Sequence, residues 1–94
     1  MAPGVFNNLV YTVNSATFES DKMAIAKGAI SNHGIRSNQL AQLMNLMTYE
    51  SSKVELAKFG HGHTVDRGNF FVVNNSLTYS SSINELNSWV FASY

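Results

Sequence analysis

Hydrophobic residues recur along most of the chain at the spacing of one helix face. Between residues 40 and 47 they stand at i, i+3, i+4 and i+7, and the same spacing runs from residue 6 to residue 13. A weaker stripe follows at Phe70, Val73 and Leu77, where two neighbouring residues, Phe71 and Val72, add β character. Further helical stripes lie within residues 23–30, 56–59 and 83–90. The pattern predicts a chain built from helices.

A short motif recurs with a longer period. Residues 17–20, 48–51 and 78–81 all read Thr, an aromatic residue, Glu or Ser, then Ser, and the copies lie about 31 residues apart. This period predicts a single all-α domain over residues 1–94, with three stacked helix-hairpin repeats at about 4–34, 35–64 and 65–94. Hairpins that stack bury one continuous core. A closed six-helix bundle fits the same periodicity and stays open as the alternative.

The motif also predicts where the second helix of each hairpin begins. Ser52 with Glu55 and Ser82 with Glu85 have the spacing of capping boxes, and Asp21 holds the equivalent place in the first unit. Glycines at positions 34, 60 and 62 are expected to end helices between the units. Three aromatic residues precede the expected caps and should pack back onto the first helix of their own unit: Phe18, Tyr49 and Tyr79.

These blocks carry a family resemblance. Residues 18–22 with 26–27, and residues 49–53 with 56–58, resemble domain-of-unknown-function family 4476, together with Asp66, residues 69–71 and residues 79–82. The resemblance covers roughly residues 5–90. It implies a small helical domain and no established activity. It also implies a module that occurs in bacteria and some eukaryotes, often within a longer protein and, in bacteria, commonly behind an export signal.

Composition excludes several classes of protein. The formal net charge is zero and only 13% of residues are charged, whereas a nucleic-acid binder usually has a basic excess. The absence of cysteine excludes disulfides, a thiol nucleophile and a Cys-based zinc site. No apolar run approaches the roughly 18 residues of a membrane span. The first four residues show no secretion signal, which favours a cytoplasmic location, although a domain excised from a secreted parent would begin in the same way.

Catalytic motifs are missing as well. The sequence contains no G-x-S-x-G, no S-x-x-K and no phosphate-binding glycine loop. Glu19 and Glu50 recur at equivalent positions of the motif, which favours a structural role for both. We therefore expect a protein that is not an enzyme and needs no cofactor.

Histidines give the chain one candidate metal site. His61 and His63 flank a glycine, Asp66 follows three positions later, and His33 stands at the matching junction between the first two units. Imidazole and carboxylate groups suit zinc, nickel or copper. The alternative is a solvated loop whose histidines lie at the end of the preceding helix, where the helix dipole favours cations.

Lysines give a candidate docking strip. Lys22 with Lys27, and Lys53 with Lys58, are pairs five residues apart that recur at the repeat period. Stacked units would place them in two rows on one face, where they could meet an acidic partner. The alternative is a solvated face on which Lys22 and Lys53 pair with the glutamates three residues before them.

The C-terminus is rich in aromatic residues, and exposure of Phe91 or Tyr94 would make an interface or a dimer contact. The leading functional prediction is a non-enzymatic module that binds a protein or peptide partner on its helical surface. Two alternatives stay open. One is a small metal-binding protein that uses the loop of His61 and His63, and the other is a self-assembling structural protein that forms a homo-oligomer.

Overall fold

The computed structural model describes residues 1–93, and the prediction made for Tyr94 lies outside them. This part of the chain is entirely helical apart from its loops, which confirms the all-α prediction. None of the helices within residues 1–93 is both long and apolar enough to cross a bilayer. The elements are α1 (Pro3–Ser15), α2 (Glu19–His33), α3 (Ser37–Asn45), α4 (Glu50–His61), the 3-10 helix η1 (Arg67–Ser76) and α5 (Ser80–Ala92).

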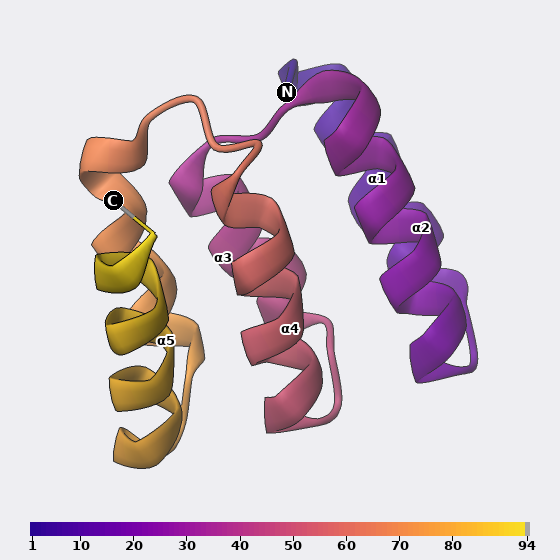
Figure 1. Ribbon diagram of the computed structural model, residues 1–94. Coiled ribbons are helices and arrows are strands. Elements are labelled where there is room, and N and C mark those ends of the chain that lie inside the picture. Colours follow the sequence, from indigo (N-terminus) through magenta and orange to yellow (C-terminus); the bar gives the residue numbers. More distant parts are fainter. Residues whose placement is uncertain (94) are drawn as a thin grey trace.

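The helices run up and down the molecule as three successive pairs, α1–α2, α3–α4 and η1–α5 (Figure 1). In the third pair, η1 packs mainly against α3 and α5 against α4. The central pair, α3 with α4, lies between α1–α2 and η1–α5. Helix α4 contacts both α2 and α5, and α3 packs along η1. The loops inside the pairs lie at one end of the molecule, which we call the loop end (residues 16–18, 46–49 and 77–79). The links between pairs lie at the other end, the junction end (residues 34–36 and 62–66) (Figure 1).

The core follows the hydrophobic stripes of the sequence. In the central helix α3, Leu40, Leu43 and Met44 are fully buried, and Val13 of α1 and Leu86 of α5 are equally enclosed. The weak third stripe forms a 3-10 helix, whose three-residue turn places every third side chain on one face. The buried residues of that helix have this spacing: Phe70, Val73 and Ser76.

The predicted capping boxes are wrong. Helices α2, α4 and α5 begin at Glu19, Glu50 and Ser80, three residues before the starts that the expected caps imply, and their N-cap residues make no side-chain cap. The glutamates expected to reach back to the caps instead pair with lysines of the neighbouring helix pair. The aromatic residues are also placed differently from the prediction, because they occupy the N-cap positions and point outward, with exposed fractions of 67, 62 and 61% for Phe18, Tyr49 and Tyr79.

Glycines end two helices, as predicted, at different backbone geometries. Gly34 ends α2 with φ of 67°, a left-handed conformation that glycine adopts without strain. Gly62 is the C-cap of α4. The prediction for Gly60 is wrong, because this residue lies buried inside α4. A β-carbon there would come within 2.7 Å of Leu40 Cδ2, so the glycine allows α3 and α4 to approach closely.

Candidate binding surface

Two glutamates link neighbouring helix pairs at the loop end. The carboxylate of Glu19, the first residue of α2, accepts the backbone N–H groups of Thr48 and Tyr49 at 2.8 and 2.9 Å. The next pair repeats the contact, since Glu50 accepts the N–H groups of residues 78 and 79 at 2.9 and 3.0 Å. Each carboxylate thus holds the chain that enters the following helix. The third motif has serine at this position, and α5 is the last helix of the row.

These contacts keep both carboxylates ionised. Burial opposes the ionised form of Glu19, but the N–H groups of Thr48 and Tyr49 outweigh it and lower the pKa below the usual 4.5. For Glu50 the N–H group of Tyr79 is the largest influence, and it too lowers the pKa of the carboxyl below 4.5. Both groups therefore bring a negative charge to the loop end at neutral pH.

Two ion pairs repeat the same spacing farther along the second helices. Lys27 of α2 meets Glu55 of α4 at 2.6 Å, and Lys58 of α4 meets Glu85 of α5 at 2.8 Å. The ammonium of Lys27 also lies 5.5 Å from the ring centre of Phe59, within reach of a cation–π contact. Residues about one to two helix turns from the loop end therefore join α2 to α4 and α4 to α5 in the same way.

The backbone contacts of Glu19 and Glu50 and the two ion pairs border two grooves on one face of the molecule. The groove between α4 and α5 has a volume of about 520 Å³, and the groove between α2 and α4 about 510 Å³. Their linings correspond at most positions, with an apolar residue, Met23 or Val54, between a glutamate at the loop end and a Lys–Glu ion pair. The exceptions are Tyr79, which has no counterpart in the second lining, and Glu55 of the first lining, which corresponds to Ala24. The lining of the first groove is Glu50, Ser51, Val54, Glu55, Lys58, Tyr79, Ser82 and Glu85; that of the second is Glu19, Ser20, Met23, Ala24, Lys27, Ser52 and Glu55.

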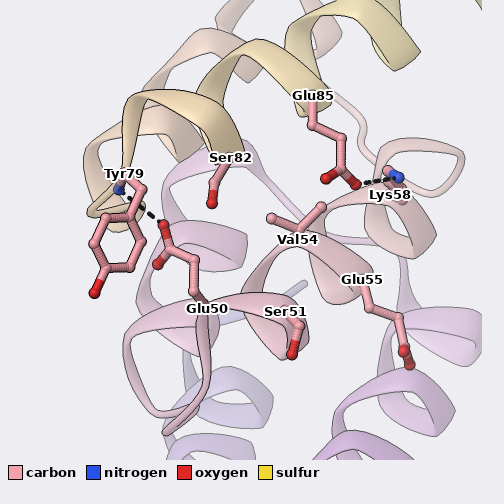
Figure 2. A pocket seen from close by; sticks show the side chains of 8 residues that line it. All are labelled: Glu50, Ser51, Val54, Glu55, Lys58, Tyr79, Ser82 and Glu85. Atoms are coloured by element: carbon pink, nitrogen blue, oxygen red, sulfur yellow. Dashed lines mark hydrogen bonds and ion pairs between the residues drawn. The ribbon is translucent and has the colours of Figure 1, made fainter.

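Figure 2 shows how the α4–α5 groove is bounded. At one end, the Glu50 carboxylate lies beside Tyr79 and accepts its N–H group. At the other end stands the ion pair of Lys58 with Glu85, and Val54 lies between the two ends. The groove therefore has an acid and an aromatic ring at one end, an apolar residue in the middle and an ion pair at the other end.

The structure separates the four lysines of the predicted docking strip into two groups. Lys27 and Lys58 line the grooves and are engaged in the ion pairs. Lys22 donates to the backbone carbonyl of Leu46 at 3.2 Å, outside the grooves. Lys53 is half-buried on α4 and also lies outside the groove linings. The four lysines are thus on second helices, as the sequence predicts, but only two of them face the grooves.

The predicted metal ligands lie at the junction end without forming a cluster. Within residues 1–93 no group of three His, Asp or Glu side chains is arranged to hold a metal ion. His33 is exposed at the end of α2, and His63 stacks against Phe59 with ring centres 5.2 Å apart. Metal binding by these residues stays a prediction from sequence.

Two of these residues have structural contacts instead. Asp66 accepts the backbone N–H and the hydroxyl of Ser37 at 2.7 and 3.0 Å, at the start of α3. Burial opposes ionisation of Asp66, but the hydrogen bonds from Ser37 outweigh it and lower the pKa below 3.8. His61 is not in a solvated loop: it is buried in the last turn of α4, edge-on to the rings of Phe70 and Trp89. Burial, and then the positive charge of Arg67, lower the pKa of His61 below 6.5.

At the C-terminal end, Phe91 has an exposed fraction of 84%, whereas Trp89 packs partly against the core. The sequence predicts an interface role for Phe91 but not for the groove residues Tyr79, Ser51 and Ser82. A signal for them exists, since Tyr79 and Ser51 belong to the recurring motif and Ser82 follows it directly. The motif does not encode their orientation, which depends on how α4 packs against α5.

The comparisons with known proteins place the chain in a family. The sequence profile described as "Domain of unknown function (DUF4476)" matches residues 1–90. The chain belongs to this family. None of the curated proteins and none of the solved structures matches it significantly. The DUF4476 assignment agrees with the resemblance carried by the recurring motif, and it adds no activity, so function is argued from the surface alone.

Proposed function

We propose that this DUF4476 protein is a non-enzymatic module that binds a protein or peptide segment across the face of α2, α4 and α5. The observation that supports it is the pair of matching grooves, each of about 500 Å³, on one face of the molecule. A segment that crosses from one groove to the next would meet a glutamate, a serine, an apolar residue and a Lys–Glu ion pair in both. Stacked helical hairpins commonly use such repeated surfaces for binding.

The exposed aromatic residues support the same face. Phe18, Tyr49 and Tyr79 stand at the loop end, where α2, α4 and α5 begin, and each is more than half exposed. Tyrosine and other aromatic residues are enriched at protein interfaces, because their side chains bury a large area at little cost in conformational entropy. Their regular exposure beside two grooves favours a binding surface over a purely structural end.

The test is a selection of displayed peptides on the whole chain, with variants that fill the grooves. Ser20 and Ser51 are exposed residues at matching positions of the two groove linings. Ser20→Trp with Ser51→Trp should abolish binding of the selected peptides. Asn7→Trp, an equally exposed position on α1 outside both grooves, should leave it unchanged. Thermal melting of all three proteins shows whether the fold is retained.

Peptides that bind the wild type and Asn7→Trp but not the double variant support the proposal. A selection that enriches nothing, or peptides that bind the folded double variant as well as the wild type, would overturn it.

A further inference from the structure

Each groove has at its loop end a glutamate that holds the backbone of an exposed tyrosine. Glu19 accepts the N–H of Tyr49, and Glu50 accepts the N–H of Tyr79. Tyr79 lines the α4–α5 groove, whereas Tyr49 lies outside the lining of the α2–α4 groove. Both tyrosines are more than 60% exposed. A carboxylate beside an exposed aromatic ring suits a guanidinium or ammonium group, because the cation can pair with the acid and stack on the ring.

The charges that line the grooves favour the same kind of ligand. Four glutamates line them against two lysines, and both lysines are already paired with Glu55 and Glu85. The excess charge therefore belongs to Glu19 and Glu50. The positive ends of the helix dipoles act against a cation, but they carry about half a unit charge each and their effect fades within the first turn. The full charges of the two glutamates outweigh them.

Lys22 and Lys53 follow these glutamates by one turn and reduce the local potential. Neither lines a groove, and Lys22 is turned toward the carbonyl of Leu46. The groove itself therefore selects against acidic segments, contrary to the docking strip predicted from the lysines alone.

The spacing of the helices sets the spacing of the ligand's charges. Glu19 and Glu50 are the first residues of α2 and α4, which pack side by side. Packed helices lie about 8–10 Å apart. A peptide in the polyproline II conformation advances about 3.1 Å per residue and brings its side chains back to the same side every third residue. It therefore covers that distance in about three residues, with both side chains facing the protein.

Resting on the function proposed above, we infer that the partner is a basic segment in the polyproline II conformation with arginine or lysine at positions i and i+3, one cation at each Glu–Tyr pair. The segment crosses α2, α4 and α5 near the loop end. Its intervening side chains lie over the apolar floor formed by Met23 and Val54.

Labelled synthetic peptides test this inference by fluorescence anisotropy on the whole chain. One Gly/Ser/Thr peptide carries arginines at i and i+3, a second carries the same arginines side by side, and a third carries glutamates at i and i+3. We expect the first to bind about threefold or more tightly than the second, and the third to bind most weakly. Added salt should weaken the first in particular, because exposed charge pairs are screened.

Isosteric variants then locate the site. Glu19→Gln with Glu50→Gln keeps an oxygen for the backbone N–H groups but removes both charges, and should weaken the first peptide by about tenfold, as expected for two exposed ion pairs. Tyr49→Ala with Tyr79→Ala should weaken it by about fivefold. Asp21→Asn, an exposed acid on α2 outside the groove linings, is the matched control and should change affinity by less than about twofold.

The outcomes separate this inference from the proposed function. If the glutamate peptide binds best, or if the selection described above enriches peptides without basic residues that bind at the grooves, the basic ligand is wrong and the binding module stands. Equal affinity of the first peptide for the wild type and the Glu19→Gln/Glu50→Gln protein would also overturn the inference. If no peptide binds in either experiment, both proposals fail.

Discussion

The two ends of the molecule join the same helix pairs by different means. At the loop end, Glu19 and Glu50 make one contact twice, to exposed backbone that begins the next helix. At the junction end, Ile35 and Thr64 form a single parallel bridge, and Asp66 bonds to Ser37. Ser37 is fully buried, whereas Thr48 and Thr78 are exposed.

This difference predicts which end of the molecule contributes more to the free energy of unfolding. A hydrogen bond at an exposed backbone can be replaced by water, whereas a donor in a buried position has no substitute when its partner is removed. The loop end is therefore free to vary and to bind, and the junction end is expected to determine stability. The predictions below are intended to test that division.

The largest expected effect is at the junction end. Asp66→Ala removes the acceptor of two donors on Ser37, which is 0% exposed, and should cost about 2–3 kcal/mol of unfolding free energy. Glu50→Ala at the loop end should cost about 1 kcal/mol or less, because water can reach the freed N–H groups. Urea unfolding measures both. Equal losses, or a larger loss for Glu50→Ala, would contradict the comparison.

Close packing at the junction end is tested by two glycines. Gly60→Ala places a β-carbon 2.7 Å from the buried side chain of Leu40, a clash that should outweigh the better helix propensity of alanine and cost about 1 kcal/mol. Gly28→Ala, at an exposed position of α2 with open space around it, should stabilise the fold by about 0.5–1 kcal/mol. Thermal melts that move in the same direction for both would show that the contact with Leu40 is unimportant.

Lowering the pH should reduce the stability of the fold in two steps, first through His61 at the junction end and then through the carboxylates of both ends. Because the pKa of His61 is lowered on folding, the unfolded chain takes up its proton first, and stability should fall as the pH drops below 6.5. The pKa values of Glu19, Glu50 and Asp66 are also lowered, so their stabilising contribution is present above the unfolded values of 4.5 and 3.8 and is lost as the pH falls through the folded ones.

Denaturant unfolding as a function of pH, on the wild type and on His61→Phe, separates the two phases. Phenylalanine keeps a ring next to Phe70 and Trp89 but cannot take up a proton. The variant should lose the decline that begins at 6.5 and keep the decline in stronger acid. If its profile matches that of the wild type throughout, His61 is not the group responsible.

The smallest effects are expected at the two ion pairs. Lys27→Met and Lys58→Met should each cost a few tenths of a kcal/mol, because both partner glutamates are 60% exposed. The two losses should be nearly equal and should shrink together in high salt. A loss well above 1 kcal/mol for either variant would show that this pair supports the fold more than its exposure suggests.

The hydrophobic pattern along the chain correctly predicts the all-α class of the fold and many of the core residues. Phe6, Leu9 and Val13, or Leu40, Leu43 and Met44, lie buried on the helix faces that their spacing predicts, because side chains at i, i+3 and i+4 share one side of a helix. Gly34 ends its helix as predicted, because its conformation is a local property.

The contacts between pairs could not be predicted in this way. Ser52 and Glu55 have the spacing of a capping box, yet Glu55 pairs with Lys27, a residue 28 positions away. A local motif shows which hydrogen bonds a segment could make, and the neighbouring helix decides which of them form. The same applies to His61 and Asp66, whose spacing fits a metal site but whose surroundings are Phe70, Trp89 and Ser37.

The sequence by itself therefore determined that the chain is helical, which side of most helices is buried, and that one motif recurs at the loop end. Only the tertiary structure decided that the aromatic residues of this motif face outward. It also decided that the glutamates of the motif accept backbone N–H groups of the next helix pair, and that two grooves lie beside these contacts. The physical reason is that helix formation, and the helix face on which apolar side chains gather, depend on residues a few positions apart along the chain. The partner of a charge or a ring depends on which residues the packing of the helices brings within a few ångströms.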